Sequence, residues 1–317
     1  MRINNDSGLA PSATVITLSI SSLMMVWAIN FVVGKITLRY IPPLILGSLR
    51  IVAGAAFMIL LVPLFRRLPV FQEESRASHP SFTWRDYWTF AYLGFFGFAV
   101  NQICFTTGLH YTNVTHSSII VGLGPIYTLI LAVLFGLEQA TWRKASGMAI
   151  SLAGVIILAS STGLAHRSPT LLGDAVTLCG SLGFAMWVVL GKRVAGKYDP
   201  ITCTLWSFIF AAILVLPLVI PQVIAFGPLS AWLALPWQAW AGLLFMTLFS
   251  STFAYLGYLW VLRFVEASQL TAFSYIMPVA ATVLSIAFLG ELGARSELSG
   301  GVLALFGVYW VESARGK

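Results

Sequence analysis

The chain contains two stretches that repeat one another. Residues 125–154 read PIYTLILAVLFGLEQATWRKASGMAISLAG, and residues 278–307 read PVAATVLSIAFLGELGARSELSGGVLALFG. An offset of 153 residues aligns a proline, a glutamate and two glycines in them: Pro125 with Pro278, Glu138 with Glu291, Gly147 with Gly300 and Gly154 with Gly307. An ordered series of matches at one offset indicates an internal duplication.

The duplication extends toward the start of each half. There an offset of 157 residues aligns Gly34-Lys35 with Gly191-Lys192 and Pro43 with Pro200. A longer loop between the second and third apolar runs of the first half accounts for the change of offset. The sequence therefore predicts two repeats, residues 14–161 and residues 171–312.

The composition places this duplicated chain in a lipid bilayer. Of 317 residues, only 9% are charged and 58% are hydrophobic, and the mean hydropathy is +0.88. An average soluble domain is about one quarter charged. The net charge of +7 does not indicate nucleic acid as a partner, because the basic residues lie between long apolar runs. The expected surroundings are lipid.

Ten apolar runs approach the roughly 20 residues that a helix needs to cross a bilayer core. They are Thr14–Val33, Pro43–Phe65, Tyr87–Thr107, Thr115–Phe135, Arg143–Ser161, Leu171–Leu190, Pro200–Ile220, Trp237–Leu262, Ala267–Leu289 and Glu297–Trp310. Because each repeat holds five runs, the second repeat enters the membrane from the opposite face. The predicted fold class is an all-α polytopic membrane protein, with ten transmembrane helices in two inverted five-helix repeats.

The positions of the basic residues predict the orientation. With the N-terminus in the cytoplasm, 13 of the 18 Lys and Arg residues fall on the cytoplasmic side and four fall outside. The positive-inside rule thus favours cytoplasmic N- and C-termini. We expect a multi-pass protein of the plasma (inner) membrane, and the sequence leaves its oligomeric state open.

Inverted repeats are typical of secondary transporters, whose site lies near the midplane between the repeats. No Gly-rich phosphate loop is present, which argues against an ATP-driven pump. We expect no enzyme, because the spans hold no His or carboxylate pair, and no cofactor or metal. The 11 acidic residues avoid the span interiors, so the usual buried proton relay is missing. Proton coupling near the span ends, exchange, facilitated diffusion and a channel all stay open.

Several motifs resemble the EamA-like family of the drug/metabolite transporter superfamily. They are Trp27-Ala28-Ile29-Asn30-Phe31, Pro43 followed by Arg50, and Gly108-Leu109-His110-Tyr111-Thr112, together with the duplicated Pro, Glu and Gly positions. The resemblance covers residues 14–312. It implies a ten-helix carrier that exports amino acids, other metabolites or drugs. It also implies a cavity lined by spans one, three, four, six, eight and nine.

Polar and aromatic side chains within these spans are the candidate substrate-binding residues. Polar groups in lipid are costly and should face a cavity or another helix. Aromatic residues near span ends are commonly interfacial, but the 157-residue offset aligns Trp187 with Asn30. The predicted set is Trp27, Asn30, Asn101, Gln102, Ser118, Trp187, Tyr258 and Tyr275. An apolar cavity with amides suits a zwitterionic or neutral amphiphilic solute, either a metabolite or a drug.

Arg50 is the single charge well inside a span, and the repeat places Ser207 at its equivalent position. One interpretation is a counter-charge for a carboxylate substrate. The other, which the sequence favours, is a structural or gating Arg that bonds to neighbouring helices. Since the family pattern carries an Arg here across many substrates, we do not expect Arg50 to determine substrate identity.

The duplicated prolines and glutamates each have two interpretations. Pro125 and Pro278 lie mid-span, where they predict either a fixed kink or a hinge. Glu138 and Glu291 end spans four and nine on opposite faces, where they predict either helix caps or alternating gate contacts.

Overall fold

The computed structural model describes residues 11–68, 71, 82–111, 117, 120–161, 171–277, 279–280 and 295–313. These residues form helices and turns and contain no β-strand. Six of the described helices are long and apolar enough to cross a membrane: Ala13–Thr37, Pro43–Phe65, Trp84–Tyr111, Leu171–Val194, Pro200–Phe226 and Trp237–Leu262. The all-helical, membrane-spanning class is confirmed, and the count of ten spans stays a prediction.

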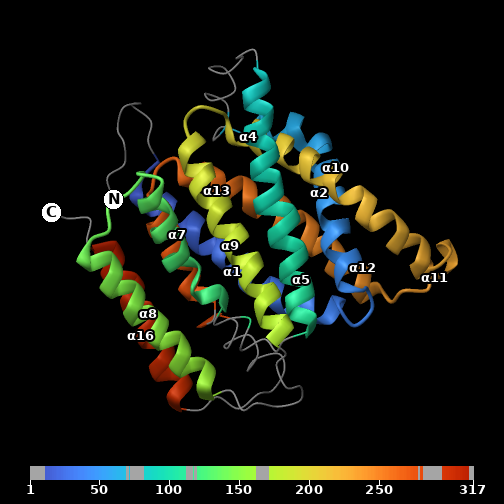
Figure 1. Ribbon diagram of the computed structural model, residues 1–317. Helices are drawn as coiled ribbons and strands as arrows, with labels where there is room; N and C mark the ends of the chain where they lie inside the picture. The colour runs from blue at the N-terminus through green and yellow to red at the C-terminus, as the bar shows by residue number, and fades with distance from the viewer. Residues whose placement is uncertain are drawn as a thin grey trace.

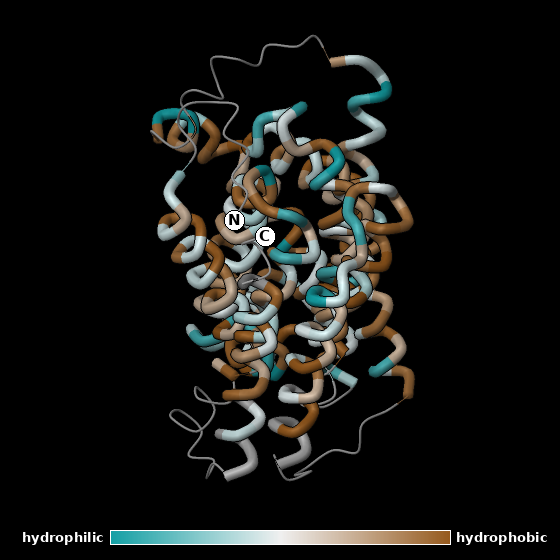
Figure 2. The backbone as a smooth tube through the Cα atoms, turned by 90° about the vertical axis from the view of Figure 1, so that its left-hand side faces the viewer, coloured by the Kyte–Doolittle hydropathy of each residue, from teal (hydrophilic) through white to brown (hydrophobic). Residues whose placement is uncertain are grey.

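The helices follow the predicted apolar runs through both halves of the chain (Figure 1). The first half holds α1 (Ala13–Thr37), α2 (Pro43–Phe65), α4 (Trp84–Gly94), η1 (Phe95–Val100), α5 (Asn101–Tyr111), α7 (Gly124–Leu134) and α8 (Trp142–Ser161). The second half holds α9 (Leu171–Val194), α10 (Pro200–Phe226), α11 (Leu229–Leu233), α12 (Trp237–Phe245), η2 (Met246–Phe253), α13 (Ala254–Leu262), α14 (Ala267–Ala272), η3 (Phe273–Tyr275) and α16 (Arg295–Ser313). Apolar residues predominate along them (Figure 2).

Local sequence explains where several helices begin and end. Ser12 caps α1, since its Oγ accepts a hydrogen bond from the Val15 amide at 3.3 Å. Asp199 caps α10 in the same way, accepting from the Thr202 amide at 2.8 Å, and Pro200 occupies the first turn. Gly227, with φ of 138°, ends α10 in a conformation that L side chains rarely adopt.

The helices pair as a two-fold relation between the halves requires. Equivalent helices pack on each other: α2 on α10, α7 on α14, and α8 on α16. Another two pairs are exchanged partners, because α5 packs on α9 while its equivalent α13 packs on α1. In Figure 1, α8 and α16 lie side by side at one edge of the bundle. Each central interface therefore joins one repeat to the other.

The α8–α16 pair is a seam of small residues. A Cβ on Gly154 would lie 2.3 Å from the Ala304 nitrogen, and a Cβ on Gly307 would lie 2.5 Å from the Ser151 nitrogen. Ser151 Oγ donates a hydrogen bond to the Ala304 carbonyl oxygen at 3.0 Å. Glycine lets the two backbones approach this closely, as in other membrane helix pairs. The duplicated glycines of this pair thus serve packing.

Spans three and eight each contain a π-helical segment, which the sequence did not predict. The 153-residue offset carries η1 (95–100) onto residues 248–253, which lie within η2. In η2 the Ser251 and Thr252 hydroxyls each lie 2.9 Å from the carbonyl oxygen five residues earlier. Short π segments are rare and are frequent at functional sites. The two segments therefore mark the middle of spans three and eight as a candidate site.

Candidate functional site

A cavity of about 820 Å³, its open mouth included, lies between the two halves. The first half contributes residues of α1, α2, α5 and α7, and the second half contributes residues of α9, η2, α13, α14 and η3. These are the spans that the family resemblance implied, with α2 added. Of the predicted substrate-binding residues, Trp27, Asn30, Asn101, Gln102 and Tyr258 line the cavity.

Asn101 connects three helices at the first residue after η1. Its Nδ2 donates to the Gly180 carbonyl oxygen on α9 at 2.9 Å, and its Oδ1 accepts from the Tyr255 hydroxyl on α13 at 2.7 Å. Because Tyr255 is the repeat equivalent of Gln102, the second bond joins spans three and eight at matching depth. The predicted amide thus ties the two halves together at the cavity.

Arg50 enters the same network from α2. Its side chain is 2% exposed, and its Nη2 donates to Ser251 Oγ at 3.0 Å and to Ser250 Oγ at 3.4 Å. Ser251 Oγ in turn donates to Gln102 Oε1 at 3.1 Å. The sequence did not single out Ser251, although the 153-residue offset carries small and polar positions of span three onto a stripe that includes Ser250, namely Thr247, Ser250, Ala254 and Gly257. The guanidinium therefore sits beside the η2 segment and lines the cavity.

Aromatic rings form one wall of the cavity. The Trp27 ring centroid lies 5.4 Å from that of Phe184, 5.5 Å from that of Tyr258 and 5.8 Å from that of Tyr255. Trp27 Nε1 donates to the Ser250 carbonyl oxygen at 3.0 Å, which fixes the indole. Sequence reasoning missed Phe184, although the 157-residue offset aligns Trp27 with it. The wall is suited to an apolar or aromatic group.

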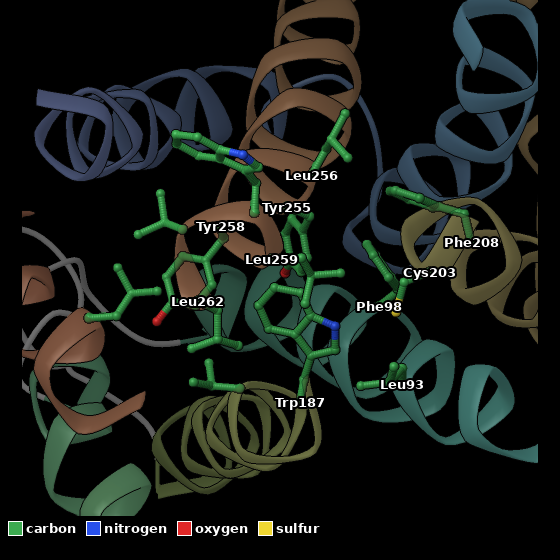
Figure 3. Packing of buried hydrophobic residues seen from close by; sticks show 14 of the residues in the cluster. Leu93, Phe98, Trp187, Cys203, Phe208, Tyr255, Leu256, Tyr258, Leu259 and Leu262 are labelled. Atoms are coloured by element: carbon green, nitrogen blue, oxygen red, sulfur yellow. The ribbon is translucent and has the colours of Figure 1, made fainter. Parts of the chain in front are cut away.

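Two predicted aromatic residues lie outside the lining. Trp187 is fully buried, with its ring centroid 4.8 Å from that of Tyr255, and it packs against Gly97, whose Cβ would lie 2.2 Å from the indole (Figure 3). Tyr275 is also fully buried, and its hydroxyl donates to the Met148 carbonyl oxygen at 3.3 Å. Ser118 lies outside the described residues.

Pro125 lies at the start of α7, just after a turn at Leu123. A proline in the first helical turn leaves no additional hydrogen bond unmade, because that amide has no partner within the helix. The helix of span four is interrupted at this turn, just before Pro125. Gly124 lies at the interruption and lines the cavity. A hinge there stays a prediction, and Pro278 lies outside the described residues.

Glu138 joins spans four, five and nine at the predicted cytoplasmic end. Its carboxylate pairs with Lys144 Nζ at 2.8 Å and accepts from the Ser268 amide at 3.1 Å and from the Ser268 hydroxyl. Lys144 also pairs with Glu266 at 2.7 Å. Glu138 thus caps α14, which is one of the two interpretations of this position. A gating role stays a prediction, and Glu291 lies outside the described residues.

A second charged contact joins α4 to the turn before α10. Lys197 Nζ lies 2.7 Å from Asp86 Oδ1, and Asp86 Oδ2 accepts from the Thr83 amide at 2.8 Å. The hydrogen bond that Lys197 donates to Asp86 raises the pKa of this lysine. The lysine is largely exposed, so the contact is a surface ion pair of small energetic weight. Both charged contacts join the first repeat to the second.

The sequence model of the EamA-like transporter family matches this chain twice, over residues 14–160 and 171–313. The chain belongs to the EamA-like transporter family. An uncharacterized transporter of Archaeoglobus fulgidus is 25% identical over 289 residues, which is 91% of this chain and 95% of that relative. An uncharacterized inner membrane transporter of Escherichia coli strain K12 is 26% identical, over 87% of this chain and 83% of the relative.

Two further likenesses concern a probable exporter and a solved structure. A probable terminal-alkyne amino-acid exporter of Streptantibioticus cattleyicolor is 22% identical over 71% of this chain and 72% of its own length. A protein of known crystal structure is 17% identical and superimposes with a TM-score of 0.73, over 96% of this chain and 98% of its own. That likeness shows the shared fold. The chain is thus an integral, multi-pass membrane transporter of the EamA-like family.

Proposed function

We propose that this EamA-like transporter is a secondary carrier that exports a small metabolite or amino-acid-like solute by alternating access. The observation that carries the proposal is the central cavity, to which both repeats contribute helices. A site between two inverted repeats of five helices each becomes accessible from either side when one repeat rocks against the other. The exporter name of the Streptantibioticus cattleyicolor relative supports the solute class.

The contact of Glu138 with Ser268 supplies a closing contact for this mechanism. It joins the end of span four to the start of span nine, and Lys144 neutralises the carboxylate there. The repeat places Glu291 at the equivalent position of span nine, and we propose that it makes an equivalent contact with span four at the other face in the alternate state, which completes a pair of gates. Breaking one contact and forming the other then opens the cavity alternately to each side.

The described lining of the cavity contains no Asp or Glu. A proton carried on a cavity carboxylate, the device of many pumps, therefore plays no part in the proposed cycle. Exchange of one solute for another, or coupling through Glu138 and Glu291 at the span ends, drives export instead. A facilitative channel and a multidrug exporter are the alternatives to be separated by experiment.

Counterflow in proteoliposomes tests the proposal. Vesicles loaded with a solute from a panel of amino acids and carboxylic acids should take up the labelled solute transiently, with saturation, which a channel does not produce. Gly124→Phe should abolish this uptake, because Gly124 lines the cavity and a Cβ there meets nothing within 4 Å. Leu134→Phe is the matched control on the outer, exposed end of the same helix.

Three outcomes would contradict parts of the proposal. Folded protein that moves no solute of the panel in either direction would refute transport of this solute class. Linear, unsaturated uptake without counterflow would make the protein a channel. Full activity of Gly124→Phe would remove the central cavity from the transport path.

A further inference from the structure

Arg50 is a buried cation whose hydrogen bonds are only partly satisfied. Its Nη2 is bound by Ser250 and Ser251, whereas Nε and Nη1 are buried and have no hydrogen-bond partner among the described residues. A lone guanidinium in an apolar interior is expensive unless an anion or further acceptors meet it. The described part of the chain brings no carboxylate within ion-pair distance of Arg50.

The carboxylates that the structure describes near the charged helix ends are already engaged. Glu138 is held by Lys144, and Asp86 is held by Lys197. Neither lines the cavity, whereas Arg50 does. The missing anion is therefore one that enters the cavity from outside the protein.

We propose that Arg50 binds the carboxylate group of the solute, in contrast to the structural or gating role that the sequence favours, so that the cavity takes small monocarboxylates with an apolar or aromatic body. The inference rests on the proposed transport function and names the chemical class of its substrate. In this arrangement the hydrogen bond from Arg50 Nη2 to Ser251 Oγ holds the guanidinium against the π-helical segment η2. The remaining nitrogens donate to the carboxylate oxygens in charge-assisted hydrogen bonds, which are stronger than neutral ones.

Other unpartnered polar atoms border the same space. Gln102 directs its Oε1 to Ser251, which leaves Nε2 without a partner, and Tyr258 OH and Ser181 Oγ also lack partners among the described residues. All three residues line the cavity with Arg50. Each can donate a hydrogen bond, so together they complement a group that only accepts, which is what an ionised carboxylate is.

The rest of the lining selects for an apolar body and against a cation. Trp27, Phe184 and Tyr258 supply the aromatic wall. Among the described lining residues none is acidic, so an ammonium group finds no counter-charge while Arg50 repels it. Lipophilic amines, the typical cargo of cation-expelling multidrug carriers, are therefore disfavoured. Asn30 Oδ1, which is buried without a partner among the described residues, is an acceptor offered to an uncharged N–H or O–H on the body.

Binding of a matched ligand series to the full-length protein in nanodiscs tests this assignment without requiring transport. The series is 3-phenylpropanoate, its amide, 3-phenylpropylamine and phenylalanine, with dissociation constants obtained from thermal shifts. Wild type should bind the propanoate about tenfold to a hundredfold more tightly than the amide, and the amine more weakly still, as charge-assisted hydrogen bonds predict. Phenylalanine should bind more weakly than the propanoate, because its α-ammonium group meets no acidic residue in the described lining.

The preference for carboxylate over amide is compared within each variant, which removes differences in overall stability. Arg50→Met should reduce the ratio to near one, and Arg50→Lys should keep part of it. Gln102→Glu provides a second, nearly isosteric variant, because a carboxylate beside Arg50 occupies the guanidinium and should also abolish the preference. Arg66→Gln, an exposed Arg at the end of the same helix, should leave the ratio unchanged.

The inference is overturned if wild type binds the amide or the amine as tightly as the propanoate, or binds none of the series at millimolar concentration. It is equally overturned if Arg50→Met or Gln102→Glu retains the wild-type ratio. A carboxylate preference in a protein that shows no counterflow would uphold Arg50 as the binding residue and refute the transport function. Counterflow by a protein without that preference would uphold the transport function and refute Arg50 as the binding residue.

Discussion

The α8–α16 seam and the α2–α10 pair both join equivalent helices of the two repeats, yet they differ in symmetry. In the seam, Gly154 and Gly307 occupy equivalent positions and do the same work, each allowing the partner backbone to approach. In the other pair, Arg50 faces the cavity, whereas its equivalent Ser207 is buried and returns its hydroxyl to the Cys203 carbonyl oxygen at 2.7 Å.

This difference distinguishes positions that pack helices together from positions that line the cavity. Positions that the duplication left identical hold helices together, since the same packing is needed on both sides of the axis. Positions at which the two copies diverged supply the cavity with its charge, amides and rings. Asn30 and Trp187 are another such diverged pair, and they lead to the largest of three expected effects.

Trp187→Ala should destabilise the protein by about 3 to 5 kcal/mol, the usual range for removing a large buried ring. The indole is fully buried and packs against Gly97 and the Tyr255 ring. Asn30→Ala, at the equivalent position on the cavity, should cost less than about 1 kcal/mol. Denaturation followed by tryptophan fluorescence or thermal aggregation in mild detergent measures both. Equal losses of unfolding free energy in the two variants would contradict this difference between a core residue and a cavity residue.

Gly154→Ala should cost about 2 kcal/mol, because its Cβ would overlap the backbone of α16 and push the seam apart. Gly124→Ala is the matched control: its Cβ meets nothing within 4 Å, and loss of backbone freedom in the unfolded chain should leave it neutral or slightly more stable. The same thermal measurement decides. If Gly154→Ala were as stable as Gly124→Ala, then α8 and α16 could move apart without loss of stability.

Ser207→Ala should have the smallest effect, within about 0.5 kcal/mol, since the Ser207 hydroxyl bonds only to a carbonyl of its own helix. It should also leave the carboxylate-over-amide binding ratio at its wild-type value, in contrast to Arg50→Met. A changed ratio in Ser207→Ala would mean that both members of the diverged pair act on the solute.

Much of the fold follows from the sequence, because lipid demands long apolar helices and the repeat offset divides them into two halves. The amides Asn101 and Gln102 could be assigned to the cavity for the same reason, since a polar group in lipid needs a partner. Trp187 could not be placed, because a repeat offset transfers position along a helix but not the shape of the neighbouring helix. Gly97 has no side chain, so the Trp187 indole packs against it in the core rather than lining the cavity.

The small-residue stripe of span three shows a second limit. The spacing of three and four residues in turn places Gly94, Gly97, Asn101, Cys104 and Gly108 on a single helix face, and the sequence predicts one stripe. In the structure Gly94 meets the Ser207 carbonyl on α10, whereas Gly97 and Gly108 meet α9. The η1 segment begins between Gly94 and Gly97 and contains Gly97, and nothing in its residues FFGFAV signals a π turn.

The π segments η1 and η2 act as phase shifts in spans three and eight. A helical wheel drawn through either segment assigns faces correctly on one side of it and one residue out of step on the other. Loss of a single residue there would restore an ordinary α-helix and leave every later side chain on the face that it occupies now, because the π turn accommodates one extra residue. A relative of this protein shorter by one residue within the segment would therefore present the same later side chains to the cavity, whereas the same loss elsewhere in the span would rotate them by about 100°.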